Sequence, residues 1–193
     1  MVKAERITGL DAVAPTGENA RIIARTRLAE LYNWNEYVDS PYAIRELHAL
    51  RIAAKRLRYT LEIFEKVLPA ECASIIKEVE QIQEELGALH DSDVMVALLR
   101  LCMGGQDGGT GYEYVLANAL RLRAKGRFIL NPEMISSLLD PKFAPAFDER
   151  QGLEQLLRHL QQRREEQYSA FLQHWYQLQT SDFRGKVLTM LDA

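Results

Sequence analysis

Residues 47–64, LHALRIAAKRLRYTLEIF, indicate which kind of fold this chain adopts. Their apolar side chains recur every three to four residues, which is the spacing of one face of an α-helix. The same segment also carries four basic residues and a histidine. Because the whole chain of 193 residues has a net charge of −3, a core-building helix that concentrates positive charge suggests an anionic partner.

Two lines of residues run along opposite sides of this predicted helix, since each residue turns it by about 100°. The first line is apolar and is expected to pack on neighbouring helices; it consists of Leu50, Ala53, Ala54, Leu57, Leu61, Phe64 and Leu68. The second line, called the basic stripe below, consists of His48, Arg51, Lys55, Tyr59 and Glu62, with Arg58 beside it. Ile52 and Ile63 flank the stripe, which favours a groove or channel over a fully solvated surface.

An ordinary surface helix also places charges opposite its leucines, and pairs of opposite charge then stabilise it. The composition of the stripe argues against that reading, because His48 to Arg58 includes four cations and no acid. Like charges at helical spacing repel by a few tenths of a kcal/mol, about 0.2–0.5 per pair. A phosphate polyanion would compensate this repulsion, since arginine, lysine, histidine and tyrosine all donate to phosphate oxygens.

The candidate ligand residues divide into three roles. Arg51, Lys55 and Arg58 are expected to make the main phosphate contacts, and His48 and Tyr59 to donate hydrogen bonds. Supporting positive potential is expected from Arg21, Arg25, Arg56 and Arg158. Arg21, Arg25 and Arg158 are surface residues unless they face the stripe. Glu62 is expected to orient a cation of the stripe.

Helical periodicity extends along nearly the whole chain, and sustained two-residue alternation is absent. We therefore predict an all-α fold, an antiparallel bundle of long amphipathic helices. The length suits a single domain over 1–193. Residues 1–16 are expected to be irregular, and the glycine-rich run 104–111 to be a flexible loop.

The predicted helices span about 18–38, 42–67, 70–86 with a continuation to 102, 112–125, 151–179 and a short terminal stretch. A proline-punctuated stretch separates the fourth and fifth, at 131–148. Ser40 is expected to cap the second helix, with Pro41 in its first turn. Gly87 is expected to interrupt the third, so that Asp91 or Asp93 caps its continuation. Ser181 is expected to cap the last helix.

Composition narrows the class of protein. With 47% hydrophobic and 26% charged residues the chain resembles an ordinary globular protein. No apolar run approaches the roughly 18 residues of a membrane span, and the start does not resemble a signal peptide, so a cytoplasmic location is expected. Cys72 and Cys102 lack the spacing of a zinc or redox motif and are predicted to be buried, reduced thiols.

The sequence contains few residues that indicate an enzyme active site. His90 and Asp91, with His48 upstream and Asp140 or Asp148 downstream, could imitate an HD-type metal-dependent phosphohydrolase. A His-Asp dipeptide is common by chance, however, and Asp91 is better placed as a helix cap. The chain has no Walker-type loop and no nucleophile elbow. We expect no catalytic residues, no cofactor and no metal.

Two binding alternatives stay open. A basic helix can enter a nucleic-acid groove, but the chain is acidic and the stripe has no exposed aromatic residue beyond Tyr59. A helical scaffold without an anionic ligand would be favoured if acids of the third helix neutralised the stripe. Residues 45–58 carry a net charge of +4 and residues 70–93 one of −6, so such neutralisation is conceivable.

LHALRIAAKRLRYTLEIF, followed by ELGALHDSDV at 85–94, closely resembles the signature of the CHAD domain, the conserved histidine α-helical domain. The matching positions are His48, Arg51, Lys55, Arg56, Leu57, Arg58, Tyr59, Glu62, Leu86, Gly87 and Asp91. The resemblance extends from about Gly17 to the end, weakly after residue 104. It implies a helical bundle with a basic central channel that binds inorganic polyphosphate, and a location at polyphosphate granules.

One departure from the family concerns the other wall of the channel. Full-length members have two halves, each with its own basic helix, whereas this chain shows the signature once. The late helix or a second protomer could supply the missing wall, and a homodimer is the hypothesis that follows. The sequence thus predicts a non-enzymatic protein that binds inorganic polyphosphate, with no membrane partner and with nucleic acid disfavoured.

Overall fold

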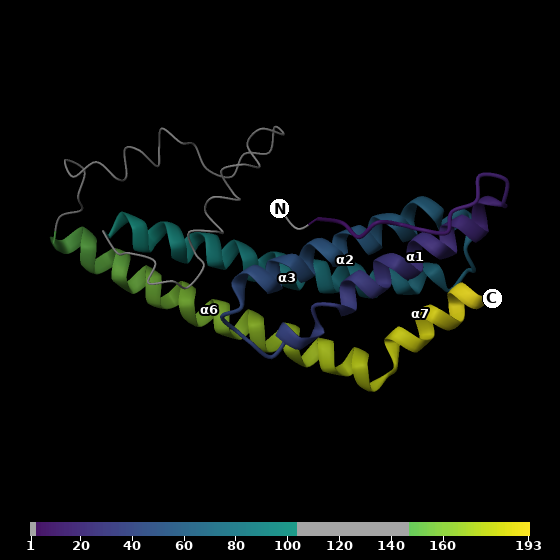
Figure 1. Ribbon diagram of the computed structural model, residues 1–193. Helices are drawn as coiled ribbons and strands as arrows, with labels where there is room; N and C mark the ends of the chain where they lie inside the picture. The colour runs from purple at the N-terminus through teal and green to yellow at the C-terminus, as the bar shows by residue number, and fades with distance from the viewer. Residues whose placement is uncertain (1–2, 104–146) are drawn as a thin grey trace. The chain divides into compact units, whose positions relative to one another are not determined.

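The computed structural model describes residues 3–103 and 147–193, and their regular structure is entirely helical (Figure 1). The α-helices are α1 (Thr16–Tyr32), α2 (Ile44–Phe64), α3 (Cys72–Cys102), α6 (Phe147–Thr180) and α7 (Phe183–Asp192). Two short 3-10 helices are η1 (Asn35–Tyr37) and η2 (Glu65–Val67). The described residues contain no strand, which confirms the all-α prediction. The glycine-rich loop, the 112–125 helix and most of the proline-punctuated stretch lie outside these ranges.

The chain divides into two compact units. Unit 1 comprises Met1–Ser40, Glu46–Gly87 and Ser169–Ala193, and unit 2 comprises Pro41–Arg45 and Ala88–Tyr168. The single domain expected from the sequence stays a prediction.

The core of unit 1 forms around the apolar face of α2. Leu50, Ala53, Ala54, Leu57 and Leu61 are all 0% exposed, as the periodicity predicts. Burial of each leucine contributes about 1.5–3 kcal/mol relative to an exposed one. The other helices of unit 1 bury Ala20, Ala24, Leu28, Leu31, Val79, Ile82, Phe171, Val187 and Leu191. Within this unit α1 packs against α7 and η2, and Figure 1 shows α1 and α7 side by side.

Gly87 does not interrupt the third helix, because α3 continues through it from Cys72 to Cys102. An interior glycine costs a helix about 1 kcal/mol relative to alanine. Burial of the neighbouring Leu86 and Leu89, which are 2% and 1% exposed, offsets that cost. Asp91 and Asp93 therefore lie inside α3, and the prediction that one of them caps a new helix is wrong.

The predicted cap of the last helix is also wrong. Asp182, rather than Ser181, caps α7: its backbone is left-handed at φ 51°, and its carboxylate accepts a hydrogen bond from the Gly185 amide at 3.1 Å. The Ser181 hydroxyl donates instead to the Leu178 carbonyl at 3.1 Å. Aspartate caps as well as serine does, and it tolerates this backbone conformation.

The start of α2 also differs from the prediction, since the helix begins at Ile44. Ser40 therefore does not cap it, and Pro41 lies in the preceding turn. The reason lies in unit 2, where the Arg164 guanidinium donates to the Pro41 carbonyl at 2.6 Å and holds that turn. Arg164 also pairs with Asp93, and both side chains are 3% exposed.

The apolar cluster of unit 2 combines Ile44 with buried residues of α3. Its buried members are Ile44, Val94, Val96, Ala97 and Leu98, and the half-buried Cys102, Leu157 and Leu160 pack against it. Both cysteines are free thiols, as predicted; Cys72 is buried, and burial raises its pKa to about 11. Across the described residues, the helices lack any segment apolar and long enough for a membrane span.

Candidate functional site

The basic stripe lies on α2 and becomes more exposed along the helix. His48 is 9% exposed, Arg51 and Lys55 are half-buried, and Tyr59 is 40% exposed. Glu62 lies at the exposed end. The residues that the sequence grouped by helical spacing therefore run from the interior of unit 1 to its surface.

Tyr59 organises the two cations nearest to it. The Lys55 ammonium lies 5.4 Å from the centre of the Tyr59 ring, and the Arg58 guanidinium carbon lies 5.0 Å from it. Cations at this distance are attracted to the negative face of the ring. Within 3–103 and 147–193, no carboxylate forms an ion pair with Lys55. Lys55 therefore keeps a charge that an external anion could meet.

Arg58 carries carboxylate partners of its own. Its Nη1 donates to Glu80 Oε1 of α3 at 2.7 Å, and its Nε lies 3.4 Å from Glu62 Oε1. The Arg58 side chain is 15% exposed, whereas those of Glu80 and Glu62 are 44% and 40% exposed. Nε makes no hydrogen bond. An acid of the third helix thus neutralises one of the three main predicted phosphate contacts.

Arg56 points to α1 and belongs to a buried network. Its Nη1 donates to Glu30, whose side chain is 4% exposed. Arg27 Nη1 donates to the other oxygen of the same carboxylate at 2.7 Å. Because Glu30 bridges two arginines in the interior, Arg56 serves α1–α2 packing and is poorly placed to support a ligand.

The remaining predicted cations lie in different surroundings. Arg25 pairs with Asp192 of α7. Arg21, one turn earlier on α1, is half-buried and its Nε makes no hydrogen bond. Arg158 lies on the part of α6 that belongs to unit 2 and is exposed. Arg21 and Arg25 therefore lie in unit 1, as the stripe does, whereas Arg158 lies outside that unit.

His48 is electrostatically distinct from the rest of the stripe. Burial, and then the positive charge of Arg51, lower its pKa from 6.5 to about 4. At neutral pH its imidazole is therefore uncharged. That state suits the hydrogen-bonding role assigned to His48 and adds no charge to the stripe.

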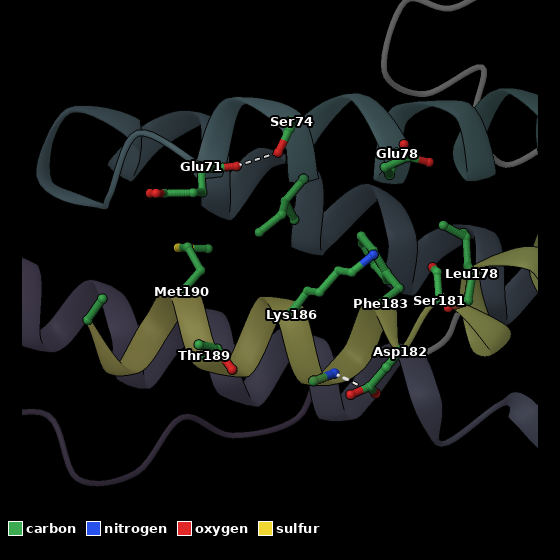
Figure 2. Close-up of a pocket in the computed structure, with 13 residues that line it drawn as sticks. Glu71, Ser74, Glu78, Leu178, Ser181, Asp182, Phe183, Lys186, Thr189 and Met190 are labelled. Carbon is green, nitrogen blue, oxygen red and sulfur yellow. Dashed lines mark hydrogen bonds between the residues drawn. The ribbon is translucent and has the colours of Figure 1, made fainter.

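A hollow of about 600 Å³ lies between α3 and α7, away from the stripe (Figure 2). Its apolar lining includes Ile75, Leu178, Phe183 and Met190. Its charged lining consists of Glu71, Glu78, Asp182 and Lys186, so acids outnumber bases. No residue of the basic stripe lines this hollow. Its charge is unsuited to a phosphate polyanion.

His174 is a polar residue for which the sequence suggested no role. Its Nδ1 lies 2.8 Å from Glu85 Oε2 and its Nε2 lies 3.4 Å from Glu78 Oε2. The two glutamates are seven residues apart and therefore share a face of α3. Their spacing was visible in the sequence, but the distant partner on α6 was not.

The residues of the HD-type alternative do not assemble a metal site in the part of the chain that is described. No cluster of three or more His, Cys, Asp or Glu side chains suited to a metal occurs in residues 3–103 and 147–193. His90 is buried and Asp91 and Asp148 are exposed. Asp140 lies outside the described residues.

Comparison with known families gives a match that covers the segment containing the basic stripe. The model described as the CHAD domain matches residues 8–100, slightly less than half of the chain. This confirms the resemblance found from the sequence, and the match includes all positions of the signature from His48 to Asp91. No curated protein and no solved structure matches the chain.

Proposed function

We propose that the protein binds a linear phosphate polyanion, inorganic polyphosphate in the first place, because residues 8–100 match the model of the CHAD domain. The ligand would lie along the basic stripe of α2, with Lys55, Arg51 and Arg58 as phosphate contacts. His48 and Tyr59 would donate hydrogen bonds. The role is one of binding, without catalysis.

The observation that carries this proposal is that the family match includes Lys55 and the exposed Tyr59 beside it on the stripe. Lys55 has no carboxylate partner among the described residues, and Tyr59 is 40% exposed beside it. A linear ligand needs cations at helical intervals along one face, and the stripe supplies them.

Titration with long polyphosphate, short polyphosphate and single-stranded DNA across a salt series tests the proposal. By analogy with nucleic acids, affinity should fall log-linearly with salt, because neutralised phosphates release counterions. Long polyphosphate should bind more tightly than DNA at matched phosphate number. Equal affinity for DNA would favour the nucleic-acid reading. Release of phosphate in the presence of divalent metal would contradict a purely binding role.

A helical scaffold without an anionic ligand is the second candidate, and the ion pairs favour it. Arg25, Arg56 and Arg58 each meet a carboxylate of the chain, so part of the predicted positive potential is already neutralised. Absence of polyphosphate binding at low salt would select this reading.

The partner and the location are parts of the same proposal. A second protomer would complete the channel wall that a single signature leaves open. Sedimentation should then show a dimer, alone or with ligand, and a monomer under both conditions would remove that hypothesis. A cytoplasmic location at polyphosphate granules can be tested by imaging a tagged protein before and after polyphosphate is depleted.

A further inference from the structure

We propose that Glu80 competes with the ligand for Arg58, so that a bound polyanion replaces an internal carboxylate. This inference rests on the proposed function, since it describes how the stripe changes between its empty and its loaded form. It makes Glu80 a residue that sets affinity without touching the ligand.

The ion pairs of Arg58 and Arg56 differ in how exposed their carboxylates are, and this difference decides whether a phosphate can replace the carboxylate. Glu80 and Glu62, the partners of Arg58, are 44% and 40% exposed, whereas Glu30, the partner of Arg56, is 4% exposed. Exposed ion pairs are weak because water and salt screen them. Breaking a buried pair leaves an uncompensated charge in the interior. Exchange with phosphate is therefore feasible at Arg58 and disfavoured at Arg56.

The geometry of Arg58 is also suited to such an exchange. Its hydrogen bond to Glu80 uses Nη1, so departure of the exposed Glu80 carboxylate frees that donor for a phosphate oxygen. The guanidinium lies 5.0 Å from the centre of the Tyr59 ring, which can hold it in place when Glu80 departs. A phosphate that approaches from the Lys55 side and takes the place of Glu80 would accept the same hydrogen bond from an arginine already oriented by Tyr59.

A distinctive salt dependence follows from this competition. In the native protein the displaced Glu80 carboxylate attracts salt cations, which offsets part of the counterion release from the polyanion. Without this carboxylate the offset is absent. Removal of Glu80 should therefore both raise the affinity and steepen the dependence of log K on log salt.

The experiment compares native protein with Glu80→Gln and with the matched control Glu84→Gln, using long-chain polyphosphate across a salt series. Glu84 is exposed on the same helix, and among the described residues it forms no ion pair. Both variants remove one negative charge. Glu80→Gln should bind about two- to five-fold more tightly than Glu84→Gln at low salt, which corresponds to the loss of one weak, partly exposed ion pair. Its salt slope should also be steeper.

Equal affinities and equal slopes for the two variants would overturn the competition while polyphosphate binding stood. Failure of the native protein and of both variants to bind would remove the proposed function, and this inference with it. Thermal unfolding of Glu80→Gln close to that of Glu84→Gln establishes that the comparison is between folded proteins.

Discussion

Glu30 shows how one carboxylate can decide the role of a nearby cation. From the sequence, Arg56 is one of four basic residues in a short stretch of helix, all of them candidates for phosphate. In the structure it donates to a carboxylate that is 4% exposed and also held by Arg27. The partners are 26 residues apart, so helical periodicity, which relates positions three and four apart, could not reveal the pair.

The buried position of Glu30 predicts a large effect on stability. Glu30→Gln should lower the free energy of unfolding by about 1.5–3 kcal/mol, because two half-buried arginines would lose their shared counter-charge. Urea denaturation followed by circular dichroism measures this loss. Glu62→Gln is the control at an exposed pair, and its effect should stay within about 1 kcal/mol. Equal effects of the two variants would contradict the distinction between buried and exposed pairs.

His48 predicts a pH dependence of stability. Its pKa is about 4 in the folded protein, below the ordinary 6.5, so the unfolded chain binds the proton more readily. The contribution of neutral His48 is complete above about pH 6.5 and is lost as the pH falls towards 4. The loss is on the order of 3 kcal/mol at about 1.4 kcal/mol per pKa unit.

The contribution of His48 can be isolated with His48→Gln, which has no imidazole to protonate. The difference in unfolding free energy between native protein and variant should shrink between pH 6.5 and 4, and a constant difference would refute the prediction. Burial raises the pKa of Asp93, so this group acts in the opposite sense: its contribution falls as the pH rises. Comparison of the two proteins cancels it, since both contain Asp93.

At the scale of elements, the sequence predicted the presence of the described helices more accurately than it predicted their ends. The apolar face of α2 follows directly from spacing, and its five core positions are fully buried. The prediction that Gly87 interrupts the helix was wrong because it used the low helix propensity of glycine, which is a local preference. Burial of Leu86 and Leu89 is a tertiary effect that this preference does not include. The predicted start of α2 was wrong for a similar reason, since Arg164, which is 123 residues away in the sequence, donates a hydrogen bond to Pro41 in the turn before the helix.

Gly87 is also a site at which α3 can be stabilised. A Cβ placed there would meet nothing within 4 Å. Gly87→Ala should therefore raise the free energy of unfolding by about 0.5–1 kcal/mol, because alanine loses less backbone entropy in a helix. Gly185→Ala is the matched control: its Cβ would clash with the Asp182 carboxylate that caps α7. Thermal unfolding should shift upwards for the first variant and downwards for the second.

At the scale of the whole molecule, net charge and local charge have opposite signs. The chain carries −3, yet a polyanion that approaches α2 would meet Lys55, which forms no ion pair among the described residues. At physiological ionic strength charges act over about 8 Å, so acids far from the stripe have little effect on this encounter. The sequence located the stripe because its charges lie on one helix. It could not assign their partners, because Glu80 and Asp192 come from helices that only folding brings near.

Two charge reversals distinguish local from overall electrostatics. Lys55→Glu and Lys77→Glu change the net charge equally, but Lys55 belongs to the stripe and Lys77 is exposed on α3. Lys55→Glu should weaken polyphosphate binding at least about ten-fold, since a cation that meets phosphate becomes a repelling charge, while Lys77→Glu should change it less than about two-fold. Titration at constant salt measures both affinities, and thermal unfolding should show both variants folded. Similar losses would mean that the ligand responds to total charge, and the stripe would then have no special role in binding.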